Sequence, residues 1–349
     1  MIFLIISVTI NDREIRVPEG VTILSAAKEL GIDIPAFSSS DSSDGNICFV
    51  EVEGVAGLPA AYSTLCADGM MIWTESPSVV EARKEILIEK LSHHPMDCLN
   101  CGKLGDCKLQ LYSEKYGVSE PLYREPYAHL PIDDSTKFYY YEPDKCISCG
   151  ECVHVCEQLM GVGAIKTAKY GDVTKVVPSS GENLAESVCV HCGNCVSNCP
   201  VGALMPKTEN KFRAWETHKV RTTCSYCGVG CQMDLIVKND AVVGVAPADG
   251  ASNSGLLCVK GKFAFDFINH KDRLTEPLIR GADGELHPAA WEDALDLITD
   301  KIKEIRGEFG ADAIAGLSSA RVTNEENYLF MKLMRAVVGT NNVDHCARL

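Results

Sequence analysis

Eight cysteines fall into two short runs with one spacing, and this spacing constrains the fold more than any other feature of the chain. The first run reads C-x2-C-x2-C-x3-C over residues 146–156, and the second repeats it over residues 189–200 and ends in a proline. Two intervening residues let a tight loop that contains glycine aim successive thiolates at neighbouring corners of one cube. The three-residue step enters a helical turn, so the fourth thiolate points away. This spacing is typical of ligands to iron–sulfur clusters.

In the two-cluster arrangement, the fourth cysteine of each run ligates the other cluster. The sequence therefore predicts two [4Fe–4S] clusters within a domain over residues 138–208, in the manner of a bacterial-type 2[4Fe–4S] ferredoxin module. The expected ligands of the first cluster are Cys146, Cys149, Cys152 and Cys199, and those of the second are Cys189, Cys192, Cys195 and Cys156. Two zinc sites or disulfides are the alternatives, but zinc usually takes two separated C-x2-C pairs.

Composition narrows the class of protein. The chain has 349 residues, a net charge of −15 and 18 cysteines, which predicts two or more domains and disfavours nucleic acid and anionic membrane surfaces as partners. Disulfide scaffolds are short and secreted, whereas these cysteines cluster at ligand spacings in a large acidic chain. The apolar start lacks the marks of a signal peptide, and no apolar run reaches the length of a membrane span. We expect a cytoplasmic protein with no membrane span and no nucleic-acid partner.

The first 75 residues predict a small domain of strands and one helix. Residues 3–17 are expected to form a β-hairpin with its turn at Asn11-Asp12, followed by an amphipathic helix from about Thr22 to Gly31. This order, with residues 50–54 and 68–70, resembles the start of a plant-type [2Fe–2S] ferredoxin. The resemblance implies a β-grasp domain over residues 1–75.

The ligands that this resemblance implies are mostly missing. They would lie near Phe37 or Ser38, at Gly45, at Cys48 and near Tyr62, and only Cys48 is a cysteine. Cys66 lies nearby, but two thiolates do not complete the four-cysteine shell of a [2Fe–2S] cluster. We therefore expect a degenerate domain that lacks this cluster and serves in docking or packing, with Cys48 and Cys66 as small buried apolar residues.

A third set of ligands is predicted in the segment over residues 76–118. Ser76 and Pro77 open a helix that runs to about Ser92, and the pattern H-x3-C-x2-C-x5-C follows it. The pattern resembles the [4Fe–4S] site with one histidine and three cysteines of complex I large subunits, [FeFe] hydrogenases and NAD-linked formate dehydrogenases. The resemblance implies His94, Cys98, Cys101 and Cys107 as ligands, with His93 in a secondary role. A zinc site with the same ligands is the alternative.

Residues 108–143 are expected to connect this segment to the two-cluster module. We expect the tyrosines of the connector to cover the clusters, and these are Tyr112, Tyr116, Tyr123 and Tyr127.

A fourth set of ligands lies over residues 217–273, in the pattern C-x2-C-x3-C-x26-C-x-K-G. It resembles the [4Fe–4S] domain of molybdopterin oxidoreductases. The resemblance implies Cys224, Cys227, Cys231 and Cys258 as ligands. It also implies that Lys260 lies between this cluster and a pterin, contributes to cofactor binding and stands on the electron path. The alternative for Lys260 is a solvated surface lysine. Strands over residues 233–237 and 241–246, with a turn at Asn239-Asp240, suit a small β module.

Residues 274–349 predict the start of an α/β domain, with a helix from Trp291, a strand near Ala313–Leu317, a helix from Asn324 to Val338 and a strand from Asn342. One strand–helix–strand unit cannot bury both faces of a parallel sheet. The segment resembles formate dehydrogenases, in which the metal-binding selenocysteine or cysteine follows the run at Cys346-Ala347-Arg348-Leu349. We therefore hypothesise that an in-frame UGA codon for selenocysteine follows Leu349, and that Cys346 is structural.

Together these patterns predict an α+β multidomain chain with four [4Fe–4S] clusters, held by His94 and fifteen of the 18 cysteines. The chain resembles the N-terminal part of a molybdopterin-dependent formate dehydrogenase alpha subunit of the NAD-linked type, related to the large iron–sulfur subunit of complex I. The full-length enzyme would carry molybdenum or tungsten on a bis-molybdopterin guanine dinucleotide cofactor. Its partners would be a flavin and NAD(P)-binding or ferredoxin-linked redox subunit and the C-terminal remainder of the same enzyme, and this fragment alone would not turn over formate. The alternatives are a complex-I-like subunit and a free-standing electron-transfer protein.

Overall fold

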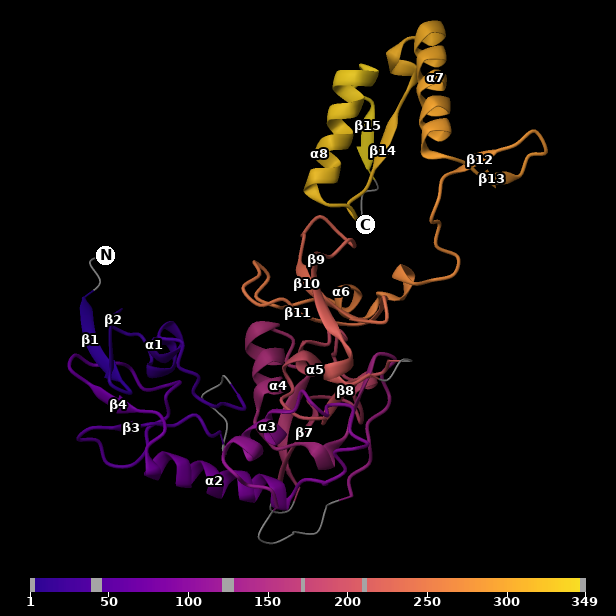
Figure 1. Cartoon of the computed structure of the whole chain (residues 1–349). Helices are drawn as coiled ribbons and strands as arrows, with labels where there is room; N and C mark the ends of the chain where they lie inside the picture. Colours follow the sequence, from indigo (N-terminus) through magenta and orange to yellow (C-terminus); the bar gives the residue numbers. More distant parts are fainter. Residues whose placement is uncertain (1–3, 39–45, 121–128, 171–172, 209–211, 346–349) are drawn as a thin grey trace. The chain divides into compact units, whose positions relative to one another are not determined.

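The computed structural model describes residues 4–38, 46–120, 129–170, 173–208 and 212–345 (Figure 1). The chain divides into two compact units, residues 1–218 and residues 219–349. Each unit is a mixture of helices and strands, and each contains more than one small sheet.

The first unit begins with a four-stranded sheet in the order β2-β1-β4-β3 (Figure 1). Its strands are β1 (Ile5–Ile10), β2 (Arg13–Pro18), β3 (Glu51–Val52) and β4 (Met71–Trp73). β1 pairs antiparallel with β2 and parallel with β4, and β3 pairs antiparallel with β4. Helix α1 (Ile23–Glu29) lies between the hairpin and the later strands in sequence, and it packs Ile23, Ala26 and Ala27 into the core of this domain.

Local sequence explains these elements. Asn11 and Asp12 both have positive φ, at 48° and 63°, as a two-residue hairpin turn of the type I′ class requires. The Thr22 side chain accepts a hydrogen bond from Ser25 N at the start of α1, and Gly31, with φ of 70°, follows its end. The predicted hairpin, its turn and the helix are confirmed.

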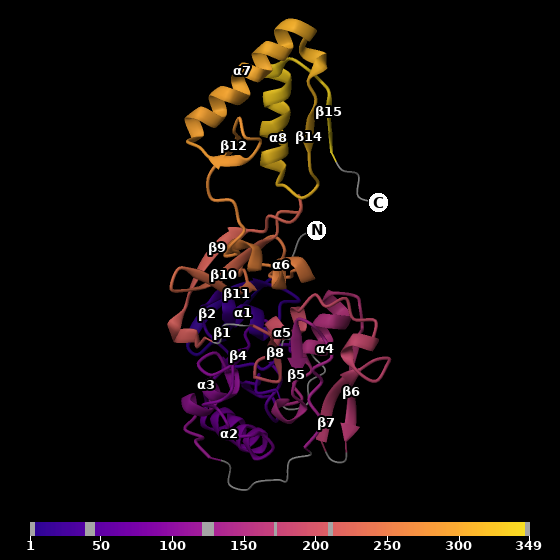
Figure 2. The ribbon, with the colours of Figure 1, turned by 90° about the vertical axis from the view of Figure 1, so that its right-hand side faces the viewer.

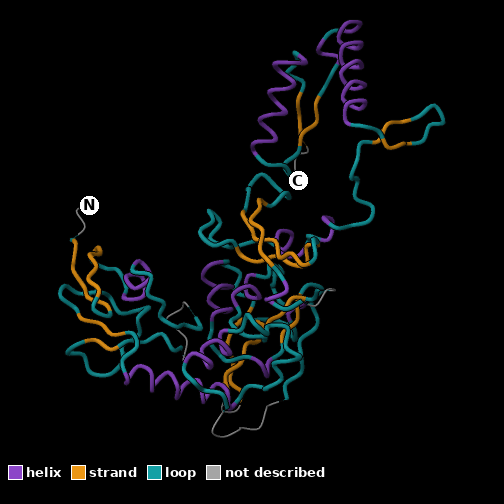
Figure 3. Tube along the Cα trace, viewed as in Figure 1, coloured by secondary structure: helices purple, strands orange, loops and turns teal. Residues whose placement is uncertain are grey.

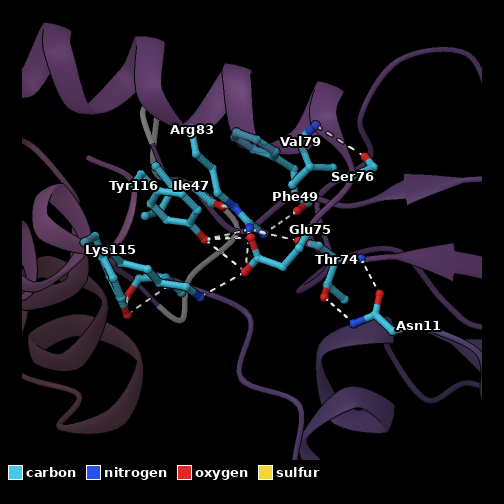
Figure 4. A network of polar contacts seen from close by, with 12 residues as sticks. Asn11, Ile47, Phe49, Thr74, Glu75, Ser76, Val79, Arg83, Lys115 and Tyr116 are labelled. Carbon is cyan, nitrogen blue, oxygen red and sulfur yellow. Dashed lines mark hydrogen bonds and ion pairs between the residues drawn. The ribbon is translucent and has the colours of Figure 1, made fainter. Parts of the chain in front are cut away.

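Helix α2 (Pro77–Ser92) begins at the predicted N-cap, where the Ser76 hydroxyl accepts a hydrogen bond from Val79 N at 3.4 Å. Its Arg83 is fully buried and lies at the centre of a network of polar contacts (Figure 4). The guanidinium donates to the carbonyl groups of Ile47, Phe49 and Thr74, at 2.8–3.1 Å. It also donates to the Tyr116 hydroxyl at 2.8 Å and forms an ion pair with Glu75 at 3.3 Å. Arg83 thus ties α2 to the loop that carries Cys48.

The rest of the first unit is mostly loop with short elements (Figure 3). Its α-helices are α3 (Lys108–Lys115), α4 (Glu151–His154) and α5 (Asn194–Asn198). Strand β5 (Tyr139–Tyr141) pairs antiparallel with β8 (Leu204–Pro206), and β6 (Ile165–Tyr170) forms a hairpin with β7 (Val173–Pro178). A π-helical turn, η2 (Val155–Leu159), extends α4, and 3-10 turns occur at η1 (Pro143–Lys145), η3 (Leu184–Glu186) and η4 (Ala214–Glu216).

The second unit begins with a three-stranded sheet in the order β11-β10-β9. Its strands are β9 (His218–Thr223), β10 (Gln232–Lys238) and β11 (Ala241–Pro247), and α6 (Val259–Phe263) and the 3-10 turn η5 (Asp266–Ile268) follow. Asn239 and Asp240 have φ of 49° and 60°, so the predicted hairpin and its turn are confirmed.

The chain then forms a β-hairpin and a strand–helix–strand unit (Figure 2). The elements are β12 (Leu278–Arg280), β13 (Leu286–Pro288), α7 (Trp291–Phe309), η6 (Ala311–Ala313), β14 (Gly316–Ser318), α8 (Asn324–Lys332), the π-helical turn η7 (Leu333–Val338) and β15 (Val343–His345). Strands β14 and β15 are parallel, as predicted. A Cβ at Gly316 would contact the Phe330 ring and Met334, so α8 and η7 pack closely on β14.

Much of the apolar surface of this last part is exposed. Helix α7 contributes no buried residue, and the side chains of its apolar residues Leu297 and Ile298 are exposed. Leu317 in β14 is 82% exposed. A two-stranded sheet is too narrow to cover two helices, so the apolar side chains of α7 have little to pack against here. Among the described residues, none of the helices combines the length and the apolarity that crossing a bilayer requires.

Candidate iron–sulfur centres

The two cysteine runs share one backbone conformation. Ser148 and His191, each directly before the second cysteine of its run, have φ of 59° and 53°. Gly150 and Gly193, each directly after that cysteine, have φ of 71° and 75°, which glycine adopts without steric cost. The amide of Ser148 donates to Cys146 Sγ at 3.4 Å and that of His191 to Cys189 Sγ at 3.3 Å. The same cysteine spacing in the two runs therefore gives two loops of the same conformation. In each loop, a backbone amide donates to the sulfur of the first cysteine.

The first predicted ligand set comes together in the structure. Burial raises the pKa of the Cys149 thiol to about 12, and the neighbouring thiols of Cys199 and Cys146 add to the rise. Burial also raises the pKa of Cys152, with the next contributions from Cys146 and Cys199. Cys199, which belongs to the second run, thus lies among the first three cysteines of the first run, as the exchange of fourth ligands requires.

The second predicted set lines one cavity. Its walls include Cys156, Cys189, Cys192 and Cys195, together with apolar residues such as Val155 and Ala164. Burial raises the pKa of Cys195, and Cys192, Cys189 and Cys156 raise it further. The amide of Ala164 donates to Cys156 Sγ at 3.3 Å. Cys156 has therefore joined the three cysteines of the other run.

Polar side chains of neighbouring elements contact both loops. The Tyr139 hydroxyl on β5 lies 3.1 Å from Cys189 Sγ. On β7, Lys175 Nζ donates to the Cys146 carbonyl at 2.9 Å, and the Ser148 hydroxyl donates to the Thr174 carbonyl. Burial lowers the pKa of Lys175, while Cys146 and Asp144 act in the opposite direction. The sequence did not indicate these contacts, because a β-hairpin between two cysteine runs carries no signal of what its side chains touch.

The histidine site is built on a tight turn. The amide of Cys101 donates to the carbonyls of Asp97 and Cys98, each at 3.1 Å, so Cys98 and Cys101 lie on one turn. Cys107 is the N-cap residue of α3; burial raises the pKa of its thiol, and Cys101 is among the groups that raise it further. The structure thus brings Cys101 and Cys107 together, with Cys98 beside Cys101 along the turn.

His94 is buried at the end of α2. Burial lowers the pKa of its imidazole to about 4, and Asp97 acts in the opposite direction. Its Nδ1 lies 2.8 Å from the Pro95 carbonyl, and because a carbonyl only accepts, Nδ1 carries the proton. The lone pair is then on Nε2. A neutral imidazole with one nitrogen fixed by a backbone carbonyl is the form in which histidine ligates metals.

The second cysteine run is in contact with the histidine segment. A Cβ at Gly202 would lie 2.5 Å from Cys101 Sγ, and the amide of Lys108 donates to the Pro200 carbonyl at 2.8 Å. From residues further along the chain, Arg213 donates to the carbonyls of Leu99 and Cys101. Three predicted cluster sites are thus packed together in the first unit.

The fourth predicted set lies in the second unit, on the loop before β10 and at the start of α6. The amide of Cys224 donates to the Cys231 carbonyl at 2.8 Å. Burial raises the pKa of Cys231, and Cys224, Cys227 and Cys258 raise it further. A Cβ at Gly261 would lie 3.7 Å from Cys224 Sγ, so α6 approaches the thiols closely. The structure brings all four predicted ligands together.

Lys260 lies on α6, two residues after Cys258 and partly buried. The same unit brings the cysteine loop to the end of β14: the amide of Gly228 donates to the Ala320 carbonyl at 3.2 Å. In parallel sheets, ligands bind beyond the carboxyl ends of the strands. The loop that carries Cys227 therefore contacts the segment that follows β14, at the edge of the sheet where a pterin is expected. The role of Lys260 stays a prediction.

In the first domain, the described residues at the positions where the ferredoxin resemblance implies cluster ligands are part of the hydrophobic core or pack against it, apart from Ser38. Cys48 and Cys66 belong to its hydrophobic core, and Phe37 is buried. Ser38 is 3% exposed, and its hydroxyl donates to Glu151 at 2.8 Å. Tyr62 packs against the core, and Gly45 lies outside the described residues. Cys48 and Cys66 are thus small buried apolar residues, while the absence of a [2Fe–2S] cluster stays a prediction.

The expectation for the connector tyrosines is wrong where the structure describes them. The Tyr112 hydroxyl lies 3.3 Å from the Ala36 amide, and Tyr116 contacts Arg83 and Glu75. Tyr112 packs α3 on the first domain at Ala36, and Tyr116 packs it on Arg83 of α2 and on Glu75, because these groups offer polar partners. Tyr123, Tyr127 and the run at Cys346 lie outside the described residues.

The thiol groups fit iron–sulfur clusters better than single metal ions. Every described cysteine is a free thiol, so disulfides do not explain the spacing. Among the described residues, no three His, Cys, Asp or Glu side chains converge closely enough to hold one ion. In a tetrahedral zinc site with Zn–S bonds near 2.3 Å, the sulfurs would lie about 3.8 Å apart. The doubled four-cysteine spacing, with Cys156 and Cys199 each lying among the cysteines of the other run, is the pattern of two [4Fe–4S] clusters.

Five family models match consecutive parts of the chain. They are the 2Fe-2S iron-sulfur cluster binding domain over residues 5–77, the NADH-ubiquinone oxidoreductase-G iron-sulfur binding region over residues 83–121, the 4Fe-4S binding domain over residues 184–205, the molybdopterin oxidoreductase Fe4S4 domain over residues 217–270 and the molybdopterin oxidoreductase model over residues 273–349. The matches cover each predicted cluster segment except the first cysteine run.

Curated proteins are similar over almost the whole chain. A subunit of an NADH-quinone oxidoreductase of Rhizobium meliloti is 38% identical over 98% of this chain and 40% of its own length. The alpha subunit of NADPH-Fe(3+) oxidoreductase of Geobacter sulfurreducens is 36% identical over 99% of this chain and 40% of its own length. A Staphylococcus haemolyticus protein named "Putative formate dehydrogenase" is 32% identical over 98% of this chain and 39% of its own length. The chain thus spans about 40% of the length of these relatives.

One solved structure shares part of the fold. It is a chain of the NAD+-reducing [NiFe]-hydrogenase in the H2-reduced state, with a TM-score of 0.55 and 24% identity over 60% of this chain and 90% of that one. Together, the family models and relatives show ferredoxin-like iron–sulfur segments followed by the start of a molybdopterin oxidoreductase segment.

Proposed function

We propose that this chain is the electron-relay portion of a formate dehydrogenase, carrying four [4Fe–4S] clusters between a molybdenum or tungsten bis-pterin site and a redox partner. The observation that carries the proposal is the assembly of four separate thiol groups, three in the first unit and one in the second. When bound, the clusters supply one-electron carriers and the pterin-bound metal supplies the formate chemistry. The chain's own residues hold, space and tune these groups.

The first unit supports a relay. Its three predicted sites are joined by direct contacts. Cys199 of the second run lies among the cysteines of the first run, Cys156 of the first run lies among those of the second, and Gly202 contacts Cys101. Close packing of the sites favours electron transfer between them, because no long stretch of protein separates one thiol group from the next. In the second unit, the Cys224 group contacts the end of β14, where a pterin would bind. We propose that Lys260 balances the negative charge of the cluster and the pterin there.

The cluster content can be measured directly. Anaerobic reconstitution of the full chain should give about sixteen irons and sixteen sulfides, and dithionite reduction should give [4Fe–4S] signals in electron paramagnetic resonance (EPR) spectra. About four zinc ions, or far fewer irons, would contradict the relay. A His94→Cys variant should keep the iron content and lower the potential of one cluster, because a thiolate adds negative charge where the imidazole is neutral.

Formate as the substrate rests on the Staphylococcus relative and on the run at residues 346–349. Formate oxidation releases CO2, one proton and two electrons, so formate should reduce the clusters of the full-length enzyme.

A second function is favoured by the two relatives with the highest identity quoted above, whose names refer to NADH, quinone, NADPH and Fe(3+). In a complex-I-like or NADPH-linked enzyme, NAD(P)H would reduce the clusters through a flavin subunit, and formate would not. Comparing the two reductants on the full-length assembly separates the functions. We propose a flavin and NAD(P)-binding or ferredoxin-linked subunit as the partner and the cytoplasm as the location.

A further inference from the structure

Lys175 is a buried lysine between two predicted cluster sites. It lies on β7, is 5% exposed, and its Nζ donates to the Cys146 carbonyl at 2.9 Å. Its charge is also close enough to His94 to influence that imidazole. Lys175 therefore lies beside the first ligand of one site and within electrostatic range of the histidine of another.

The position of this lysine is fixed by its own strand. Beside it on β7, the Thr174 carbonyl accepts a hydrogen bond from the Ser148 hydroxyl, and the Val176 amide donates to the Tyr141 hydroxyl at 3.1 Å. Three consecutive residues of β7 are thus bonded to the first cysteine loop or to the strand that leads into it. These bonds hold β7 beside the first cysteine loop, and the bond from Nζ places the ammonium group at the Cys146 carbonyl.

The charge of Lys175 is balanced differently from that of the other buried lysine in this region. Lys145 forms ion pairs with Asp97 at 3.1 Å and Glu142 at 2.9 Å. Within the described residues, the bond of Lys175 Nζ is to a neutral carbonyl, and no carboxylate forms an ion pair with it. Asp144 and Lys90 lie within electrostatic range and carry opposite charges. Burying an ammonium without a counter-ion is costly, so an anionic group on the other side of Cys146 would complete the site.

We propose that Lys175 sets the reduction potential of the cluster held by Cys146, Cys149, Cys152 and Cys199, by placing a fixed positive charge beside Cys146. The inference rests on the proposed function, because it requires a cluster at these cysteines. Reduction of such a site adds one electron and breaks no bond, so the site gains one negative charge. A nearby buried cation stabilises the reduced state more than the oxidised one, and this raises the potential.

Variants at this position separate the charge from the hydrogen bond. Lys175→Met removes both at similar volume, Lys175→Gln removes the charge and keeps a donor, and Lys175→Arg keeps the charge. Lys169→Met is the matched control, because Lys169 lies on the same hairpin and is exposed. The measurement is an EPR-monitored redox titration of the reconstituted full chain, with dithionite as the electron donor and with a Cys146→Ser variant to assign the signal.

We expect Lys175→Met and Lys175→Gln to lower the reduction equilibrium constant of the assigned cluster at least tenfold, which is about 59 mV for one electron. Lys175→Arg and Lys169→Met should stay near the wild-type potential. Equal potentials in Lys175→Gln and Lys175→Arg at full iron content would overturn the inference, and so would loss of the cluster in all three Lys175 variants, since the lysine would then be structural. Absence of [4Fe–4S] signals in the wild-type chain would instead contradict the proposed function.

Discussion

Gly202 and Cys101 are in direct contact, although they lie in segments that the sequence assigns to different cluster sites. A Cβ at position 202 would lie 2.5 Å from Cys101 Sγ. Real Cβ atoms do not approach a sulfur this closely, so any side chain at 202 displaces one of the two residues. The contact explains why a glycine stands three residues after Cys199, where the sequence alone indicates no special conformation.

We predict that Gly202→Ala disturbs the histidine site and leaves the other sites intact. A thiolate bound to a cluster cannot turn aside as a free side chain would, so the added methyl group competes with the cluster for Cys101. Iron should fall from about sixteen to about twelve per chain, with the loss of one EPR signal. Gly307→Ala is the control, because no atom lies within 4 Å of a Cβ at that position. Full iron content in Gly202→Ala would contradict the prediction.

Tyr139→Phe should lower the potential of the cluster at Cys189. The hydroxyl lies 3.1 Å from Cys189 Sγ and would donate to a thiolate there. Hydrogen bonds to ligand sulfur raise cluster potentials, so their removal favours the oxidised state. Redox titration of the variant checks this, with Tyr140→Phe on the same strand as the control. An equal shift in both variants would show that the hydrogen bond is not the cause.

Cys48 should resist alkylation in the folded chain. Burial raises the pKa of its thiol from 9.0 to about 11, and Arg83 opposes the rise. At pH 8 its reactive thiolate fraction is then about a hundredfold smaller than that of an ordinary thiol. Peptide-resolved mass spectrometry after iodoacetamide treatment measures the rate, with the urea-unfolded chain as reference. Similar rates in both states would contradict the prediction.

The same shift predicts how stability depends on pH. Because the pKa of Cys48 is higher in the folded state, the neutral thiol stabilises the fold below about pH 9, and this contribution is lost as the pH rises from 9 to 11. Thermal melting of wild type and Cys48→Ala across this range should therefore differ in slope, with the steeper loss in wild type. Parallel curves would show that another group is responsible.

Arg83→Met should destabilise the first domain. The variant leaves the carbonyls of Ile47, Phe49 and Thr74 without their donors in a buried site, and each unsatisfied group costs about 1–3 kcal/mol. We expect a loss of at least about 3 kcal/mol, visible as a lower melting temperature and as early proteolysis within the first 75 residues. Lys84→Met, one residue further along α2 and partly exposed, is the control. Equal melting temperatures would mean that the network in Figure 4 contributes little.

Local signals predicted the elements and the grouping of thiols well. The turns at Asn11-Asp12 and Asn239-Asp240, the cap at Ser76 and the parallel pairing of β14 and β15 follow from turn chemistry, capping and the strand–helix–strand pattern. The exchange of Cys156 and Cys199 follows from the doubled spacing. These features depend on residues close in sequence or on a motif repeated within the chain.

Contacts between distant segments were not predictable in the same way. The buried Arg83, the lysine beside Cys146 and the approach of Gly202 to Cys101 depend on how loops pack, and no periodicity encodes that. The connector tyrosines show the same limit: an aromatic residue in a loop has an apolar face that packs equally well on a cluster or on a domain, and here Tyr112 and Tyr116 pack on the domain.

The Ser38–Glu151 hydrogen bond changes what the N-terminal domain can do for the rest of the chain. Near a position where the ferredoxin resemblance implies a ligand, the Ser38 hydroxyl donates to Glu151, which lies between Cys149 and Cys152. This bond joins the N-terminal domain to α4, the helix that carries Cys152. Any displacement of that domain would therefore act directly on the loop that holds these two cysteines.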